Sequence, residues 1–204
     1  MLYLSTVNPK ALELLKEIQE LPLLENFYLV GGTALALHLG HRISIDLDFF
    51  TANEFNTASI IDSLKEKYTI SLLAQATNSL TLNIESIKTD FIRHNYPLLK
   101  PLLLIDGIKL ASVEDIAAMK LNSTMNRGSK KDFFDIYELL KHYSLKQLLT
   151  FQSEKYDFSS AMIVLKSLVY FEDAEKEPEP VSTNSTTWQL VKTKIRDEVR
   201  LYSK

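Results

Sequence analysis

The sequence predicts an α+β fold, in which a mixed sheet flanked by helices is followed by a helical C-terminal lobe. Three observations support this prediction. Strand-like and helix-like segments alternate near the N-terminus, β-prone runs cluster between residues 68 and 92, and beyond Gly107 apolar residues recur at helical spacing. We therefore expect a core over residues 1–107 and a helical lobe over residues 108–204. With 204 residues, 46% of them hydrophobic, the chain can bury a sizeable core.

The first half of the chain is expected to contain three helices and five strands. Gly31-Gly32 separates the first strand from the helix that follows it, and Asn78-Ser79 forms a turn between two later strands. In chain order the elements are a helix after Asn8-Pro9 that ends near Leu21, a strand at 27–30, a helix at 34–39, a strand at 43–50, a helix at 56–68, and strands at 68–76, 80–84 and 87–92.

The second half is expected to be helical. Ser112 is a suitable cap for a helix that runs through Leu121, and Ser129 for one that ends near His142. Further helices are expected at residues 145–151, 161–170 and along 188–199, whereas the acidic, proline-containing residues 172–180 read as a solvated loop. The aromatic residues of the second helix have core spacing; they are Phe133, Phe134 and Tyr137.

Composition excludes several classes of function. The chain has no cysteine, so disulfides, zinc–thiolate sites and thiol nucleophiles are absent, and its four histidines lack zinc-like spacing. The net charge of −3 argues against broad, sequence-independent nucleic-acid binding, although Lys120 to Lys131 is a candidate local basic patch. No apolar run reaches the roughly 18 residues that a membrane span needs, and no signal peptide is evident. We expect a cytoplasmic protein that does not bind membranes.

The segment Ile43 to Phe50 alternates apolar and polar residues with a period of two. On a strand this places Asp46 and Asp48 on one face, with Leu47 and Phe49 on the other. Two carboxylates so close resist joint ionisation unless a cation lies between them. Mg²⁺, or Mn²⁺ in its place, fits this need and also binds phosphate oxygens. Asp90, on a later strand, is a third candidate metal ligand and a candidate proton acceptor.

Gly31-Gly32-Thr33 lies where a strand meets a helix. Glycine lets backbone N–H groups approach a phosphate, the helix N-terminus favours negative charge, and Thr33 adds a hydroxyl donor. Taken alone, a Gly-Gly pair is usually only a tight turn, and a lone Asp-x-Asp is usually solvated. A calcium loop is excluded, because the glycine and the later glutamate of an EF-hand are missing.

Two segments together resemble a known family. Gly31-Gly32-Thr33-Ala34-Leu35, followed by Arg42-Ile43-Ser44-Ile45-Asp46-Leu47-Asp48-Phe49-Phe50, resembles the AbiEii/AbiGii group of bacterial nucleotidyltransferase toxins, within the superfamily that has a DNA polymerase beta-like fold. That group also has a later lysine and an Arg-x-x-x-Lys-Asp-x-x-Asp segment. Their counterparts here are Lys120 and the run from Arg127 to Asp135, with one extra residue if Lys131 is the match. The resemblance covers about residues 28 to 140.

The resemblance implies a nucleoside triphosphate held in a cleft between the core and the helical lobe. Arg42 is expected either to reach a phosphate or to pair with Asp46, and one of Asp132 and Asp135 either to support catalysis or to form a structural ion pair. Taken together, the residue patterns and the resemblance predict three sets of site residues: the catalytic residues Asp46, Asp48, Asp90, Lys120 and Asp132; the metal ligands Asp46, Asp48 and Asp90; and the nucleotide-binding residues Gly31, Gly32, Thr33, Arg42, Lys120, Arg127 and Lys131.

By the same resemblance, the chain would be the toxin of a type IV toxin–antitoxin or phage abortive-infection system, with a cognate antitoxin as partner. It would transfer a nucleotide to RNA, in particular to the 3′ end of tRNA. Two alternatives remain open at this point. One is an enzyme that modifies a small molecule, such as an aminoglycoside, or a protein hydroxyl. The other is a non-catalytic nucleotide-binding or antitoxin-docking module, which the presence of all the carboxylates disfavours.

Overall fold

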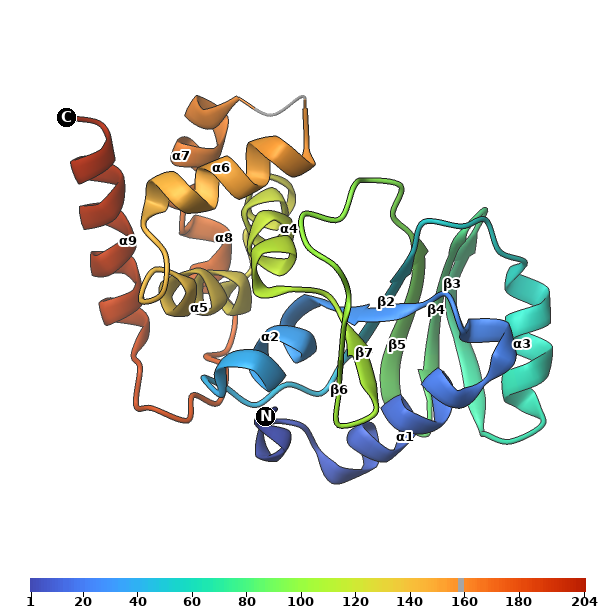
Figure 1. Cartoon of the computed structure of the whole chain (residues 1–204). Helices are drawn as coiled ribbons and strands as arrows, with labels where there is room; N and C mark the ends of the chain where they lie inside the picture. Colours follow the sequence, from blue (N-terminus) through green and yellow to red (C-terminus); the bar gives the residue numbers. More distant parts are fainter. Residues whose placement is uncertain (158–159) are drawn as a thin grey trace.

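The computed structural model describes residues 1–157 and 160–204, and within them it shows a mixed sheet with helices at its side and beyond its end. The strand order is β3-β4-β5-β2-β1-β7-β6. Figure 1 shows α1 and α3 beside the sheet and α4 to α9 gathered at the other end of the molecule, with α2 between the two groups. This confirms the predicted class, a mixed sheet flanked by helices with a helical C-terminal part.

The sheet combines parallel and antiparallel pairs. β2 lies between β1, to which it is antiparallel, and β5, to which it is parallel, while β1 is parallel to β7. The remaining neighbours, β3 with β4, β4 with β5 and β6 with β7, are antiparallel. The strands are β1 (Tyr28–Val30), β2 (Leu47–Thr51), β3 (Ile70–Ala76), β4 (Ser79–Ile84), β5 (Ile87–Arg93), β6 (Leu103–Ile105) and β7 (Ile108–Leu110).

The helices begin where the sequence offers capping residues. The Asn8 side chain accepts a hydrogen bond from the N–H of Lys10, Ser112 accepts one from Asp115, and Ser144 forms a capping box with Gln147. The α-helices are α1 (Pro9–Glu20), α2 (Gly31–Leu39), α3 (Thr57–Lys65), α4 (Val113–Asn126), α5 (Lys130–Leu139), α6 (Leu145–Lys155), α7 (Ala161–Leu168), α8 (Glu172–Glu175) and α9 (Trp188–Tyr202); short 3-10 turns lie at Leu4–Thr6 and Pro22–Leu24. None of these helices has the length and apolar character that crossing a bilayer requires.

The expected strand at 43–50 is shorter in the structure, where β2 begins only at Leu47. The preceding residues bond to distant segments instead: the N–H of Ile43 donates to the carbonyl of Val181 at 2.8 Å and that of Ser44 to Thr6 at 2.9 Å. The alternation of apolar and polar residues therefore begins four residues before the part of the segment that pairs in the sheet. Asp46 lies just before β2 rather than on it.

Besides the two 3-10 turns, the strands β6 and β7 and the helix α8 were not predicted from the sequence. β6 and β7 have three residues each, too few for a pattern of period two to be visible, and α8 occupies part of the expected loop at 172–180. Because β7 pairs with β1, the sheet extends past the expected boundary at residue 107. Our proposed division is accordingly a sheet-based part through Leu110 and a helical part from Val113.

The core is continuous through both parts of the chain. Phe49 and Phe91 stack at 5.4 Å between ring centroids under the sheet, and α2 is buried along most of its length. In the helical part Phe133 and Phe134 pack against Trp188, which confirms their expected place in the core.

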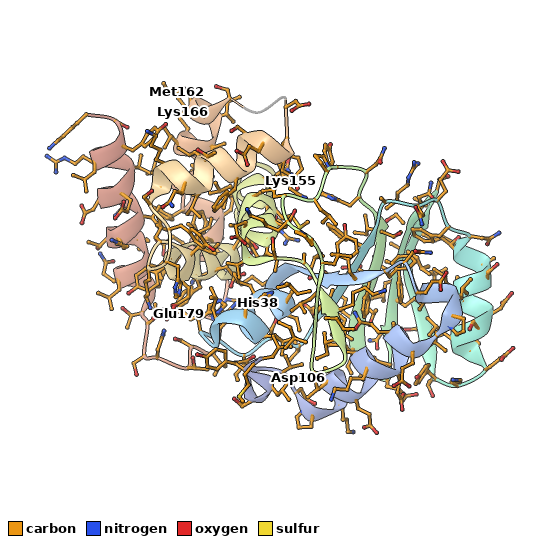
Figure 2. All side chains as sticks on the ribbon, in the orientation of Figure 1. His38, Asp106, Lys155, Met162, Lys166 and Glu179 are labelled. Atoms are coloured by element: carbon orange, nitrogen blue, oxygen red, sulfur yellow. The ribbon has the colours of Figure 1, made fainter. Side chains whose placement is uncertain are left out.

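A buried ion pair fastens the loop that connects β5 to β6. Lys155, labelled in Figure 2, is fully buried with Asp115, and its Nζ lies 2.7 Å from Asp115 Oδ1 and 2.7 Å from the carbonyl of Pro97. The Asp115 carboxylate also accepts the N–H groups of Leu99 and Lys100 at 2.9 and 3.2 Å. The loop over residues 94–102 is thus held against α4 and α6.

Candidate active site

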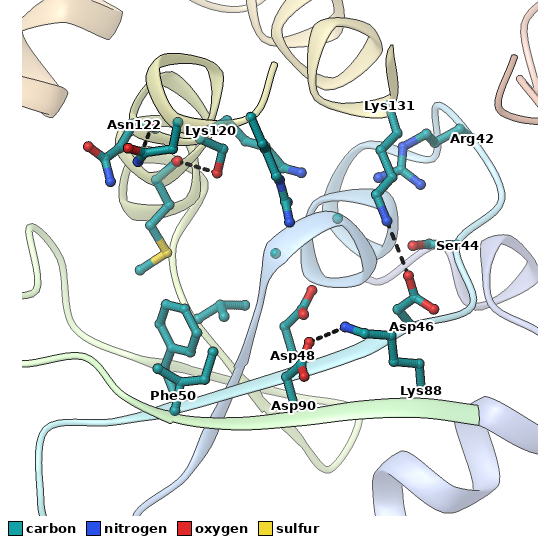
Figure 3. A pocket seen from close by; sticks show the side chains of 18 residues that line it. Arg42, Ser44, Asp46, Asp48, Phe50, Lys88, Asp90, Lys120, Asn122 and Lys131 are labelled. Carbon is teal, nitrogen blue, oxygen red and sulfur yellow. Dashed lines mark hydrogen bonds and ion pairs between the residues drawn. The ribbon is translucent and has the colours of Figure 1, made fainter. Parts of the chain in front are cut away.

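A pocket opens where the N-terminus of α2 meets β2, β5 and the helical part of the chain (Figure 3). Its cavity volume is about 330 Å³, within the range of small-molecule sites. Gly31 and Gly32 form one wall, strand residues form the floor, and α4 with the start of α5 faces them. Most of the residues singled out in the sequence meet here.

Three carboxylates lie on the floor of the pocket. Asp48 on β2 and Asp90 on β5 are register partners in adjacent parallel strands, so their side chains stand on the same face. Asp46 lies before the strand, yet it lines the same pocket. The intervening Leu47 and the following Phe49 are fully buried on the opposite face. The three predicted acids therefore line one pocket, although only two of them are on strands.

The two glycines at the start of α2 allow side chains to approach the backbone closely. Gly31 has φ +69°, and a Cβ there would lie 2.1 Å from Oδ2 of Asp48. A Cβ on Gly32 would lie 2.1 Å from Nη2 of Arg42. Helix α2 has no side-chain cap, so its first N–H groups remain available to an anion. The turn thus brings a carboxylate and a helix N-terminus to the same place.

Thr33 does not line the pocket. Its hydroxyl is buried, lies 2.9 Å from Ser44 Oγ and donates a short hydrogen bond to the carbonyl of Asp46. The predicted contact with phosphate is replaced by a contact inside the protein. Thr33 holds the Ser44–Asp46 segment against α2 and so positions the first carboxylate.

Behind the pocket lies a buried network centred on Asp135. Its carboxylate accepts hydrogen bonds from Arg42 Nε at 2.6 Å and Nη2 at 3.0 Å, and it lies 2.7 Å from His41 Nε2 and 2.6 Å from Lys120 Nζ. Burial alone would raise the pKa of Asp135, but the charges of Arg42 and Lys120 outweigh it and hold that pKa well below its usual range. Arg42 therefore pairs with Asp135, and not with Asp46 as one of the two predictions had it.

Asp132 is the second acid of this network. It lies 2.8 Å from Lys120 Nζ, 2.7 Å from Ser129 Oγ and 3.2 Å from Arg127 Nε. Burial opposes its ionisation, but Lys120 and Arg127 together lower its pKa. Lys120 is thus shared between two buried carboxylates, and their charges raise its pKa against the effect of burial. Asp132 and Asp135 thus hold Lys120, Arg42 and Arg127, which line the pocket, and we propose that both acids position these cations.

The three carboxylates on the pocket floor have different neighbours. Burial and the neighbouring charge of Asp90 raise the pKa of Asp48. Asp90 accepts a hydrogen bond from Thr81 at 2.6 Å and a short one from Lys88, whereas Asp46 pairs with Lys131 at 3.1 Å (Figure 3). The pocket floor therefore gathers three carboxylates, of which Asp90 and Asp46 each pair with one lysine.

The carboxylate oxygens of Asp46, Asp48 and Asp90 suit a hard divalent ion, but the three side chains are not already arranged around one ion position. Over residues 1–157 and 160–204 no three acidic or histidine side chains are arranged to hold a metal ion. Lys88 and Lys131 cover Asp90 and Asp46, and both lysine side chains are about half exposed, so they are free to turn away. Asp48 and Asp90 fit as the principal ligands, and Asp46 as a further one.

Comparison with known proteins agrees with this geometry. The model of the family described as "Nucleotidyl transferase AbiEii toxin, Type IV TA system" matches residues 13–97 and 67–202. The chain belongs to the AbiEii family. It is therefore a nucleotidyltransferase of the toxin type, and this excludes a merely nucleotide-binding module. Nucleotidyltransferases generally use a divalent metal ion.

Individual relatives support the same grouping. An uncharacterized protein of Aquifex aeolicus is 42% identical over 171 residues, which cover 81% of this chain and 83% of that protein. A structure described as a candidate nucleotidyltransferase from H. pylori has a TM-score of 0.62 at 20% identity and covers 95% of each chain. MenT4, a nucleotidyltransferase toxin from Mycobacterium tuberculosis, has a TM-score of 0.60 at 13% identity over 97% of this chain and 86% of its own. The last two likenesses show the shared fold.

Of the four cations expected to bind the nucleotide in this AbiEii-family pocket, two are accessible and two are buried. Arg42 and Lys120 are nearly buried by their acidic partners, whereas the side chains of Arg127 and Lys131 are 61% and 46% exposed. The latter two therefore have donors to spare for an incoming phosphate. Sequence reasoning did not assign a role to several further lining residues: Ser44, Phe50, Lys88, Ile92, Met119, Asn122, Ser123 and Asn126.

Some of these residues could have been predicted from the sequence, because side chains two residues apart on a strand lie on the same face. Phe50 follows Asp48, and Lys88 and Ile92 flank Asp90, each at a spacing of two residues on a strand. Met119, Asn122, Ser123 and Asn126 recur at helical spacing along α4. What the sequence did not show is which face of α4 the sheet meets.

Proposed function

We propose that the chain transfers a nucleoside monophosphate from a nucleoside triphosphate to an RNA hydroxyl, in particular at the 3′ end of tRNA, and that it does so as a cytoplasmic toxin with a cognate antitoxin. The observation that carries the catalytic part is the in-register pair Asp48 and Asp90 beside the uncapped N-terminus of α2. The toxin role is supported by the description of the family.

A divalent ion, Mg²⁺ or Mn²⁺, would be held by Asp48 and Asp90, with Asp46 as a further ligand, and would supply neutralisation of phosphate charge. Arg127 and Lys131 bind the β- and γ-phosphates together with the N–H groups at the start of α2. The acceptor hydroxyl forms a new bond to the α-phosphorus while the bond to the β-phosphate oxygen breaks. Pyrophosphate leaves with that electron pair, and Asp90 accepts the hydroxyl proton.

The acceptor is tested by incubating the chain with each α-labelled nucleoside triphosphate, Mg²⁺, and total tRNA, a protein extract or an aminoglycoside in separate reactions. We expect label in tRNA, and its loss after removal of the 3′-terminal nucleotides. Label in protein or in the small molecule with none in RNA would replace the RNA acceptor by one of those classes. A chain with Asp62→Asn, an exposed carboxylate on α3, serves as the active control.

Lys88→Met tests whether the lysine competes for the cation position. Burial lowers the pKa of Lys88, but its hydrogen bond to Asp90 and the charges of Asp90, Asp48 and Asp46 raise it more. The variant should therefore bind Mg²⁺ about fivefold more tightly, as expected for a half-exposed ion pair of ~1 kcal/mol, and melt at a lower temperature in chelator. Calorimetric titration with Mg²⁺ and thermal unfolding measure both effects.

The exposed Lys146 at the start of α6 provides the matched control for this experiment, as Lys146→Met. It should change neither quantity. Weaker Mg²⁺ binding by Lys88→Met would show that Lys88 assists the ion rather than competing with it.

A further inference from the structure

The pocket has an apolar end that the transfer chemistry described above does not use. Phe50 and Ile92 are register partners on β2 and β5, two residues beyond the Asp48–Asp90 pair on the same face of the sheet. At the rise of a strand this places them roughly 7 Å from the carboxylates. Met119 of α4 lines the same pocket. Apolar side chains thus lie at about the distance that a ribose spans from the α-phosphate to a base.

Charge is distributed unevenly along the pocket. Figure 3 shows Lys131 and Arg42 to one side of Asp48, and Phe50 and Asn122 to the other. A triphosphate directed toward the cationic end leaves its base at the apolar end, because the acids that face the α-phosphate lie between the two. The pocket therefore has one direction in which a nucleoside triphosphate matches it chemically.

The ring of Phe50 is held in place by a row of aromatic side chains. It stacks on His94 with 4.7 Å between ring centroids and 22° between planes, and His94 contacts Tyr96 at 4.8 Å. Burial, followed by the charge of Lys155, lowers the pKa of His94 to about 4, so the imidazole is neutral at neutral pH. Phe50 is therefore a supported aromatic surface, and such surfaces stack on any base.

Asn122 supplies polar groups beside this surface. Its side chain is half-buried in the pocket, and within the described residues its amide makes no hydrogen bond to the protein. Its neighbours on α4 differ: the Ser123 hydroxyl donates to the carbonyl of Met119 at 2.9 Å, and the Asn126 amide donates to the carbonyl of Asn122 at 3.0 Å. An amide offers a donor and an acceptor side by side, which is the pattern on the edge of a base.

We propose that this end of the pocket is the nucleobase subsite, in which the base of the nucleoside triphosphate stacks on Phe50 and hydrogen-bonds to the Asn122 amide. The inference rests on the proposed function, since it takes the triphosphate to lie over Asp48 and Asp90. It assigns base contact to Phe50 and discrimination between bases to Asn122.

The test compares ligands with and without a base. Calorimetry in Mg²⁺ measures the Kd of ATP, CTP, GTP, UTP and inorganic tripolyphosphate for the unmodified chain, Asn122→Leu and Phe50→Leu. Asn122→Leu should raise the Kd of the best-bound nucleotide about tenfold, the effect of one or two hydrogen bonds. It should also reduce the differences in Kd among the four nucleotides. Phe50→Leu should weaken all four by similar factors. Neither change should alter the Kd of tripolyphosphate.

Asn53→Leu is the matched control, because Asn53 is exposed and outside the pocket; it should bind all five ligands as the unmodified chain does. Equal losses for tripolyphosphate and nucleotides, or no loss in either variant, would overturn the subsite. Those results leave nucleotide binding by the unmodified chain intact. Failure of the unmodified chain to bind any of the four nucleotides would instead overturn the proposed function, and the subsite with it.

Discussion

Asp48→Asn is expected to lower the rate of nucleotidyl transfer by about a thousandfold while leaving the fold intact. The side chain stands on the pocket floor beside Asp90 and against Gly31, where it is the carboxylate that no lysine covers directly. The amide keeps its shape but not its charge. Transfer of label from the nucleotide, compared with Asp62→Asn, measures the loss.

Stability should move in the opposite direction from activity. Because burial and Asp90 raise the pKa of Asp48, the folded chain binds that proton more tightly than the unfolded chain does. The group therefore lowers stability as pH rises from the ordinary carboxylate range through its raised pKa. In the presence of chelator and at pH values above that range, Asp48→Asn should melt at the same temperature as the unmodified chain or at a higher one. Its melting temperature should also fall less than that of the unmodified chain as pH rises. Near-normal transfer by this variant would refute the assignment of Asp48.

Asp135→Asn is expected to destabilise the chain by about 3–5 kcal/mol. The change leaves Arg42 and Lys120 buried with less negative charge, and Arg42 Nη2 occupies the space beside Gly32. The pKa of Asp135 is held well below its usual range, so its stabilising effect is complete above the ordinary carboxylate pKa of about 4 and is lost as pH falls through the folded value.

Denaturant unfolding at neutral and acid pH measures this effect. The difference between the unmodified chain and Asp135→Asn should be largest at neutral pH and shrink in acid. Asp173→Asn on α8 changes an exposed carboxylate and should leave stability within about 0.5 kcal/mol. A similarly small change for Asp135→Asn would show that the buried network does not hold the helical part against the pocket.

The sequence predicted the local parts of this site better than the long-range ones. Alternation identified Asp48, and the Gly-Gly pair identified the start of α2, because both patterns depend on neighbours in the chain. Parallel pairing of β2 with β5 sets Asp90 beside Asp48 across about forty residues, and no local pattern encodes that register. Asp46 was predicted to lie on the strand because the alternation of apolar and polar residues starts at Ile43. In the structure the residues before Leu47 form hydrogen bonds to Thr6 and Val181 instead of pairing in the sheet.

Some side chains that the sequence assigned to phosphate binding instead form ion pairs inside the protein, and the sequence could not show this because their partners are distant in the chain. Arg42 and Asp135 are far apart in the chain, and only the packing of α2 against α5 brings them into contact. Lys88 adjoins Asp90 at a spacing of two, so its place on the pocket floor followed from the strand, but its position over the carboxylate did not. The short strand β7 pairs with the distant strand β1, and β6 pairs only with β7, so neither strand could be predicted from its own residues.

The central claim is that Asp48 and Asp90 jointly hold the ion that meets the triphosphate. A crystal structure of the chain with Mg²⁺ and a non-hydrolysable nucleoside triphosphate tests it most directly. We expect one ion about 2.0–2.1 Å from an oxygen of each aspartate, with a phosphate oxygen in its coordination shell and Lys88 turned away from Asp90. A nucleotide bound outside this pocket, or an ion that touches neither carboxylate, would contradict the account.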